Sequence, residues 1–333
     1  MVSKKIKVST IGVGHLGAIH CKLLAENNEI EFAGVYDKSE QHCIKIADQY
    51  KVNCFSKLED AINYSDALII AAPTIHNKEI ATEVIKNGKH CFIEKPVCSN
   101  SKEANDLLQL AKNYNKVKIQ IGHIERFNPA ILEAKKYNLN PLFIEAHRLS
   151  QFKPRSTDVS VVYDLMIHDI DLVLWLTNSD IKQISANGVS VITDTIDVAN
   201  ARIEFENGMV ANLTASRLSA KSMRKFRIFQ NDGYYSLDFA KGELELFRII
   251  DNNTSSIKKE NIIPTQLLGD LPKLKDKSII YEMPEVNKIN AMAEEQNIFF
   301  GSILENNEVG CSLADGIKAL QVADKINEMI MQN

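Results

Sequence analysis

Residues 6–17 read Ile-Lys-Val-Ser-Thr-Ile-Gly-Val-Gly-His-Leu-Gly, and this stretch decides the fold of the first half of the chain. Its first six residues, rich in β-branched side chains, have the pattern of a strand, and helical spacing begins near the last glycine. In the G-x-G-x-x-G spacing, Gly12 permits a tight turn, Gly14 lets the backbone approach a pyrophosphate, and Gly17 lets helix and strand pack closely. The stretch therefore predicts a dinucleotide-binding turn.

An acidic residue ends the second expected strand, as a dinucleotide site of this type requires. The carboxylate of Asp37 can accept hydrogen bonds from the adenine ribose, while the backbone N–H groups of His15 and Leu16 face the pyrophosphate. The charge of Asp37 repels a 2′-phosphate, which favours NAD over NADP. Lys38 beside it could bind that phosphate, so NADP stays open. Thr74, after a later strand, is a further candidate contact.

Strands and helices alternate through residues 6–122. The run Ala-Leu-Ile-Ile-Ala-Ala at 67–72 is continuously apolar, as expected of a central parallel strand covered on both faces. Strands that alternate with helices of about ten residues predict βαβ units and a doubly wound parallel sheet, the Rossmann type of α/β domain. We expect strands at 6–11, 30–36, 67–72, 90–93 and 117–122, and helices at 16–25, 41–50, 79–87 and 102–114.

The pattern changes beyond Gly122. Asn207-Gly208 is a strong hairpin signal between two of several neighbouring strands, and such a series predicts an α+β domain with a large, open, mostly antiparallel sheet. Residues 251–277 are polar and are interpreted as a surface excursion. We expect an NAD(P)-binding domain at 1–124 and a substrate-binding and oligomerisation domain at 125–333. Helices are expected at 129–137, 162–177, 287–305 and 313–331, and strands at 142–147, 181–189, 198–205, 209–216, 225–230, 234–238 and 243–250.

Composition limits the classes of function. The 333 residues carry a net charge of −4, which gives no reason to expect nucleic acid or an anionic membrane as partner. The N-terminus lacks the apolar core of a secretory signal, and no apolar stretch approaches the roughly 20 residues that span a bilayer. The six cysteines form no C-x-x-C pair, and neither they nor the histidines show metal-ligand spacing. We therefore expect free thiols, a cytoplasmic protein and no metal site.

Two segments supply groups suited to the oxidation of an alcohol. This reaction needs a group that takes the hydroxyl proton and a cation or donor that holds the developing alkoxide. Glu94-Lys95-Pro96 follows the strand 90–93 at the carboxyl edge, where doubly wound sheets bind ligands. Asp164 and His168 are four residues apart on an expected helix and share one face, and Asp171 lies near that face. On spacing alone, a solvated turn and a surface or core ion pair are equally good interpretations.

The order of these motifs, G-x-G-x-x-G, then Glu-Lys-Pro, then Asp-x-x-x-His, resembles the Gfo/Idh/MocA family of oxidoreductases over nearly the whole chain. The resemblance implies a Rossmann domain, then a domain with a large open sheet used partly for oligomer contacts. It also implies a catalytic Lys95 with Asp164 and His168, and Glu94 and Lys95 near the cofactor. His168, whose type has an unperturbed pKa of about 6.5, could take the hydroxyl proton, or Lys95 could if burial lowers its pKa.

Five segments lie at 122–129, 154–158, 164–171, 200–202 and 212–217. Together they resemble the subgroup of this family that oxidises C3 of UDP-N-acetylglucosamine, where the 3-keto sugar passes to an aminotransferase on the route to the 2,3-diamino sugar of lipid A. Arg155 is the first candidate for the diphosphate, because its loop leads into the expected active-site helix. His123, Arg126 and Asn128 lie at the domain junction and are candidate substrate contacts, although Arg126 could equally be a structural hinge contact. Other basic residues are phosphate candidates or solvated surface charges: Arg148, Lys153, Arg217, Lys221, Arg224 and Lys225.

Two alternatives stay open. A dehydrogenase of the same family could act on a free sugar, inositol or another polyol. A non-catalytic NAD-sensing regulatory protein is the other alternative, and the intact set of Lys95, Asp164 and His168 argues against it. An open sheet face is expected to be covered by another copy, so the sequence predicts a homodimer or homotetramer.

Overall fold

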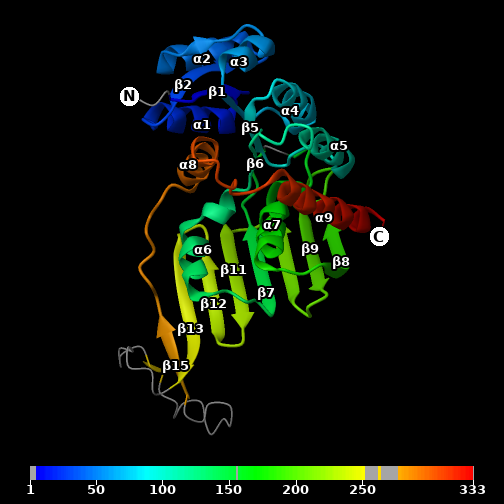
Figure 1. Cartoon of the computed structure of the whole chain (residues 1–333). Coiled ribbons are helices and arrows are strands. Elements are labelled where there is room, and N and C mark those ends of the chain that lie inside the picture. The colour runs from blue at the N-terminus through cyan, green and yellow to red at the C-terminus, as the bar shows by residue number, and fades with distance from the viewer. Residues whose placement is uncertain (1–4, 155–156, 252–261, 264–276, 333) are drawn as a thin grey trace. The chain divides into compact units, whose positions relative to one another are not determined.

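The computed structural model describes residues 5–154, 157–251, 262–263 and 277–332 (Figure 1). The chain divides into two compact units. The first unit comprises Met1–Ile124 with Ala291–Asp324, and the second comprises Glu125–Asn290 with Lys325–Asn333. Arg155, the predicted diphosphate contact, lies outside the described residues.

A parallel sheet forms the centre of the first unit, as predicted. Its described residues make six strands in the order β3-β2-β1-β4-β5-β6. The order reverses between β1 and β4, and the crevice at the carboxyl ends of such strands is where doubly wound sheets bind ligands. The strands are β1 (Lys7–Ile11), β2 (Glu31–Tyr36), β3 (Asn53–Cys54), β4 (Ala67–Ile70), β5 (His90–Glu94) and β6 (Ile119–Gly122).

The helices of the first unit begin where the sequence supplies a cap. Ser39 accepts the backbone N–H of His42 at the start of α2, and Asn100 accepts that of Glu103 at the start of α5. Buried residues of α1 recur at helical spacing, so one face of the helix packs on the sheet. These helices are α1 (His15–Glu26), α2 (Glu40–Tyr50), α3 (Leu58–Tyr64), α4 (Asn77–Lys86) and α5 (Ser101–Ala111).

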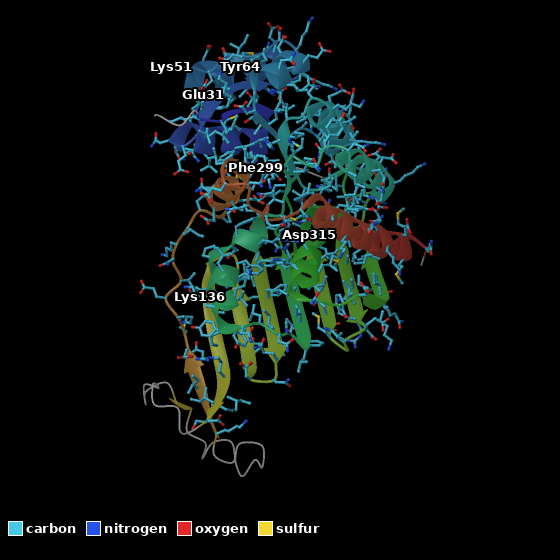
Figure 2. All side chains as sticks on the ribbon, viewed as in Figure 1. Glu31, Lys51, Tyr64, Lys136, Phe299 and Asp315 are labelled. Atoms are coloured by element: carbon cyan, nitrogen blue, oxygen red, sulfur yellow. A yellow bond between two sulfur atoms is a disulfide. The ribbon has the colours of Figure 1, made fainter. Side chains whose placement is uncertain are left out.

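The chain returns to the first unit after residue 290, although the sequence placed all of residues 125–333 in the second domain. Helix α8 (Ala291–Leu304) and most of α9 (Leu313–Met331) belong to the first unit. Phe299 of α8, labelled in Figure 2, packs edge-on against Phe92 of β5 with ring centroids 5.9 Å apart. These rings join one buried apolar cluster, so α8 completes a core that the first 124 residues leave open.

A disulfide joins Cys43 of α2 to Cys54 of β3, so the prediction of six free thiols was wrong for this pair. No motif marks the pair; packing of α2 beside β3 brings the two Cα atoms to 5.6 Å, a distance that a disulfide can span. The disulfide also removes the cysteine argument for a reducing compartment. The other four cysteines are free and buried: Cys21, Cys91, Cys98 and Cys311.

The second unit contains the large, mostly antiparallel sheet that the sequence predicts. Its described residues form nine strands in the order β14-β15-β13-β12-β11-β7-β10-β9-β8, in which β7 and β10 pair in parallel. Gly208, with φ +84°, makes the predicted hairpin turn between β9 and β10. The strands are β7 (Phe143–Leu149), β8 (Ile181–Val189), β9 (Val198–Phe205), β10 (Val210–Ser216), β11 (Met223–Gln230), β12 (Gly233–Asp238), β13 (Glu243–Asp251), β14 (Ile262–Ile263) and β15 (Lys277–Glu282).

The two faces of this sheet differ. Helices α6 (Pro129–Ala134) and α7 (Ile167–Leu176) cover one face (Figure 1). The other face carries a row of five aromatic rings whose neighbouring centroids lie 4.7–5.8 Å apart, on adjacent strands from β7 to β15. The aromatic row consists of Phe143, Phe229, Tyr234, Phe247 and Tyr281.

No helix in the described parts of the chain is both long enough and apolar enough to cross a membrane.

Candidate functional site

The glycine turn after β1 has the close backbone packing that its sequence predicts. Gly12 adopts φ +83°, and a Cβ added there would lie 2.8 Å from the backbone of Ala72. A Cβ on Gly17 would lie 1.9 Å from the carbonyl oxygen of Gly12, so α1 could not pack this closely with any other residue at that position. A Cβ on Gly14 would meet nothing within 4 Å. The space beside the exposed His15 and Leu16, at the N-terminus of α1, therefore suits an anionic ligand.

Asp37 lies beside this turn. One carboxylate oxygen accepts the backbone N–H of Val13 at 2.7 Å, and the other accepts that of Ser39 at 2.8 Å. These two bonds leave lone pairs available, because an ionised carboxylate offers about four acceptor positions. The contact between Asp37 and Val13 joins the ends of β1 and β2, as a site for the adenosine part of a dinucleotide requires.

Two other predicted cofactor contacts follow strands of the same sheet. The Nζ of Lys38 lies 3.2 Å from Nε2 of His76, at the end of the short helix η1 (Thr74–His76) after β4. Thr74 begins that helix and is partly buried. Because β1, β2 and β4 are neighbours in a parallel sheet, the segments after them meet at one edge, and the fold brings these residues to the expected side of the sheet.

Replacing Asp37 with asparagine is expected to reduce the preference for NADH over NADPH by about tenfold or more. The amide keeps an acceptor oxygen but removes the negative charge, whose repulsion of a 2′-phosphate at short range is worth about 1–4 kcal/mol. Fluorescence titration of NADH and NADPH measures the ratio of dissociation constants. Glu59→Gln, at an exposed carboxylate on α3, is the matched control. An unchanged ratio in Asp37→Asn would contradict the role of Asp37.

The Glu94-Lys95-Pro96 turn begins at the last residue of β5 and is held by hydrogen bonds. The side chain of Glu94 accepts the backbone N–H of Lys95 at 3.2 Å, and its other oxygen lies 2.7 Å from Nε2 of His20. Asn77 donates its amide hydrogens to the carbonyls of Glu94 and Pro96. Glu94 is therefore a structural anchor of the turn, whereas Lys95 itself is only half-buried.

In the second unit, the predicted helix at 162–177 consists of a π-helical turn followed by an α-helix. It begins with a π-helical turn, η4 (Val162–Met166), in which the N–H of Ile167 bonds to the carbonyl of Val162, and continues as α7. Asp164 lies in the π turn and His168 in the first turn of α7, and both are half-buried. Such π turns are frequent at functional sites.

Buried ion pairs fix the orientation of α7. Arg148 of β7 contacts Asp169 through two bonds of 2.7 and 3.0 Å and contacts Glu125 at 2.7 Å. Burial alone would lower the pKa of Arg148, but these carboxylates outweigh it and raise that pKa, while burial raises the pKa of Asp169. Arg148 is thus an internal counter-ion, neither a solvated charge nor an open phosphate site.

A second buried ion pair joins two residues singled out in the sequence. Arg126 holds Asp171 through bonds of 2.7 and 2.8 Å, and its guanidinium lies over the ring of Trp175. The sequence expected Arg126 at the substrate and Asp171 near the face of His168. Asn128 is also buried: its oxygen accepts the N–H of Ala130 and caps α6. These contacts give Arg126 and Asn128 structural roles within the second unit.

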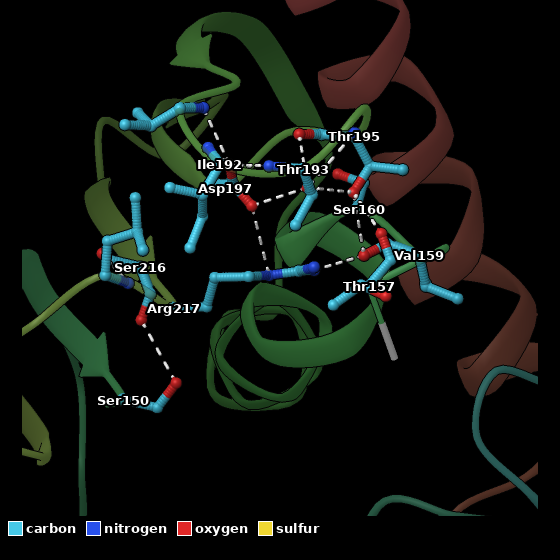
Figure 3. Close-up of polar contacts among 12 residues, drawn as sticks. Ser150, Thr157, Val159, Ser160, Ile192, Thr193, Thr195, Asp197, Ser216 and Arg217 are labelled. Carbon is cyan, nitrogen blue, oxygen red and sulfur yellow. Dashed lines mark hydrogen bonds and ion pairs between the residues drawn. The ribbon is translucent and has the colours of Figure 1, made fainter. Parts of the chain in front are cut away.

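Asp197 fixes the segment that leads into η4 (Figure 3). Its carboxylate accepts the backbone N–H groups of residues 191, 192 and 193, and these bonds outweigh burial and lower its pKa to about 2. Arg217, predicted as a phosphate contact, lies 3.7 Å from Asp197 and donates to the carbonyl of Val159. Thr195 also contacts the carbonyl of Val159. This network holds residues 157–160, which directly precede the helical segment that carries Asp164 and His168.

The remaining predicted residues are found in different environments. His123 is buried directly after β6, and its backbone N–H bonds to the carbonyl of Ile121. Lys153 and Lys221 are exposed, and Lys225 pairs with Asp238 at 3.2 Å. Sequence reasoning missed His20 and Gln296. The signal for His20 was its helical spacing from Gly17 and Leu24, which places a polar side chain on the buried face of α1.

Two family models match the chain. A model described as an oxidoreductase family with an NAD-binding Rossmann fold, Gfo/Idh/MocA, matches residues 6–123. A model of the Gfo/Idh/MocA C-terminal domain matches residues 131–236. The two matches follow each other along the chain as the two sheets do.

Proteins with similar sequences include sugar and inositol dehydrogenases. The chain is 33% identical over 319 residues to UDP-N-acetylglucosamine 3-dehydrogenase of Acidithiobacillus ferrooxidans, covering 96% of this chain and 95% of that one. A solved structure of that enzyme matches with a TM-score of 0.86 and 31% identity, covering 98% of both chains. scyllo-Inositol 2-dehydrogenase (NAD⁺) of Bacillus subtilis is 25% identical over 237 residues, covering 65% of this chain and 68% of that one.

Proposed function

The chain belongs to the Gfo/Idh/MocA family of NAD-binding oxidoreductases, and on that premise we propose that it oxidises C3 of UDP-N-acetylglucosamine to a ketone. The observation that supports this substrate is the 33% identity to a dehydrogenase of that name over 96% of the chain. The glycine turn and Asp37 fit a dinucleotide, because the space beside Gly14 is open and the carboxylate lies at the end of β2.

The proposed chemistry uses a bound cofactor together with Lys95, Asp164 and His168. Bound NAD⁺ supplies the acceptor for the hydride that leaves the carbinol carbon. His168 takes the hydroxyl proton, and Lys95 donates a hydrogen bond to the same oxygen and stabilises the developing negative charge. Asp164 contacts the substrate or orients His168. The products are the ketone, NADH and a proton. The π turn under Asp164 and the anchored turn at Lys95 support these roles, because both hold a polar group on a fixed backbone.

A free polyol is the second candidate substrate. The 25% identity to scyllo-inositol 2-dehydrogenase extends over 65% of this chain. The substrate named for that relative contains no nucleotide. The two candidates differ in their need for a diphosphate contact. The proposed contact is Arg155, which lies outside the described residues.

The proposal includes a homodimer or homotetramer. The aromatic row lies on the sheet face opposite α6 and α7, and neighbouring rings are as close as 4.7 Å. These rings are partly exposed, and a second copy of the chain could bury them in an interface, because aromatic side chains contribute strongly to interfaces. We further propose a cytoplasmic enzyme whose ketone product passes to an aminotransferase on a lipid A route, on the strength of the same relationship to UDP-N-acetylglucosamine 3-dehydrogenase.

Purified protein with NAD⁺ is expected to produce NADH with UDP-N-acetylglucosamine and not with N-acetylglucosamine, glucose or myo-inositol. NADH absorbance measures the reaction, and a ketone trap or an aminotransferase with an amino donor draws it forward. Turnover with a free polyol alone would overturn the UDP-sugar assignment and keep the dehydrogenase. NADH binding without turnover of any of these substrates would contradict the proposed roles of Lys95 and His168.

A further inference from the structure

A buried imidazole connects the dinucleotide helix to the Glu94-Lys95-Pro96 turn. His20, on α1, has no exposed surface. Its Nε2 lies 2.7 Å from a carboxylate oxygen of Glu94, and its Nδ1 lies 2.8 Å from the amide nitrogen of Gln296 on α8. The ring also packs edge-on against Phe92, with centroids 5.3 Å apart. Two hydrogen bonds and a ring contact therefore fix this side chain in one orientation.

The chemistry of the neighbours determines where the ring proton lies. The amide nitrogen of Gln296 only donates hydrogen bonds, so Nδ1 of His20 accepts one. The proton of the neutral ring then sits on Nε2 and is donated to Glu94, whose carboxylate only accepts. The second oxygen of Glu94 accepts the backbone N–H of Lys95 at 3.2 Å. Three hydrogen bonds therefore link Gln296 to the backbone of Lys95, and Glu94 accepts one from His20 on one side and one from Lys95 on the other.

These bonds hold a carboxylate that is almost entirely buried. Glu94 is 8% exposed, so its charge is mostly removed from water and needs donors nearby. A Cβ on Gly122 of β6 would lie 3.0 Å from the same carboxylate, so β6 leaves just enough room for it. If the donor on His20 were lost, the carboxylate of Glu94 would lose one of its two hydrogen bonds and would be free to turn. Its bond to the backbone of Lys95 would then weaken.

We propose that His20 and Gln296 are positioning residues for Lys95, which they reach through Glu94. The proposal rests on the proposed catalytic role of Lys95. His20 cannot be a catalytic residue itself, because it has no exposed surface from which to contact a substrate. Because His20 lies on α1, the helix that begins at the glycine turn also helps to position Lys95. Gln296 brings α8 into the same arrangement.

His20→Leu is expected to lower kcat by about 10–100-fold, since loss of an outer hydrogen-bond partner, or a shift of about 1 Å in a reacting group, has effects of this size. The dissociation constant for NADH is expected to change by less than about threefold, because the glycine turn and Asp37 are untouched. His20→Gln retains an N–H donor near the position of Nε2 and is expected to recover most of the lost rate. Gln296→Leu is expected to have a smaller effect in the same direction.

A stability control separates positioning from simple loss of packing. Leu24→Ala removes buried side-chain volume from the same helix. Leu24 is no partner in the three hydrogen bonds, so the variant should lower the melting temperature without a selective loss of kcat. Equal loss of kcat in Leu24→Ala and His20→Leu at equal destabilisation would overturn the proposal. Failure of His20→Gln to exceed the rate of His20→Leu would also overturn it.

A measurement without substrate distinguishes this proposal from the proposed function. After reductive ¹³C-methylation of lysines, the NMR signal of Lys95, assigned with Lys95→Arg, is expected to shift in His20→Leu and to stay unchanged in Leu24→Ala. The ring ¹⁵N shifts of His20 are expected to report the tautomer with the proton on Nε2. An unchanged Lys95 signal or the other tautomer would overturn the positioning role, even in an enzyme that oxidises the UDP-sugar. The expected shifts in a protein that oxidises no sugar would support the arrangement and overturn the proposed function alone.

Discussion

Replacing His168 with alanine is expected to lower kcat by about 10²–10⁴-fold, the usual contribution of a positioned acid–base group. NADH binding is expected to stay unchanged, because the glycine turn and Asp37 belong to the first unit and are not altered. Steady-state rates with the substrate identified by the panel, together with an NADH titration, measure the two effects. Asn178→Ala, at an exposed residue just after α7, is the control.

The pH dependence of kcat/KM identifies which residue takes the proton. If His168 is the base, the acidic limb of the profile is expected to disappear in His168→Ala and to persist in Lys95→Met, whose low rate comes from lost stabilisation of the oxygen. The reverse result would assign the proton transfer to Lys95. A near-normal rate in His168→Ala would contradict both versions of the mechanism.

Arg148→Met is expected to destabilise the second unit by about 3–5 kcal/mol, because it leaves the carboxylates of Asp169 and Glu125 buried without their counter-ion. Trp175, the sole tryptophan of the chain, lies on α7 and reports the unfolding of this unit directly. Its fluorescence during urea denaturation measures the change. The first unit contributes no tryptophan signal, so the measurement does not require the two units to unfold together.

Two variants test the physical reason for that loss. Arg227→Met breaks a pair with Glu145 on the partly exposed sheet face and should cost about 1 kcal/mol or less. Arg148→Met combined with Glu125→Gln and Asp169→Asn removes the buried charges together and is expected to recover part of the stability. If Arg148→Met were no more harmful than Arg227→Met, the buried ion pairs would not be what fixes α7.

The sequence predicted those features whose cause is local. The alternation of apolar strands with helices, the glycine turn and the Asn207-Gly208 hairpin each follow from a few neighbouring residues. Lys95, Asp164 and His168 were proposed as catalytic because a family resemblance assigned meaning to short motifs that spacing alone left ambiguous. The strand at 277–282 was missed because it adjoins a polar stretch without periodicity.

Features that depend on partners distant in the sequence were not predictable in this way. Amphipathic spacing shows that α8 has a buried face, but not that Phe92 of the first unit is what covers it. Cys43 and Cys54 were assigned as free because no motif relates them. Arg148 and Arg217 were taken for phosphate or surface charges, since their carboxylate partners become visible only when β7, β10 and α7 pack together.

The route of the chain through the first unit has a consequence for biosynthesis. Translation adds about 5–20 residues per second, and a domain that emerges early can ordinarily fold before the rest is made. Here the Rossmann sheet leaves the ribosome with the face around Phe92 uncovered and His20 without Gln296, until the segment Ala291–Asp324 has been synthesised. The nascent chain must therefore carry an unfinished apolar surface through the synthesis of the entire second sheet, a period in which a chaperone would have most to protect.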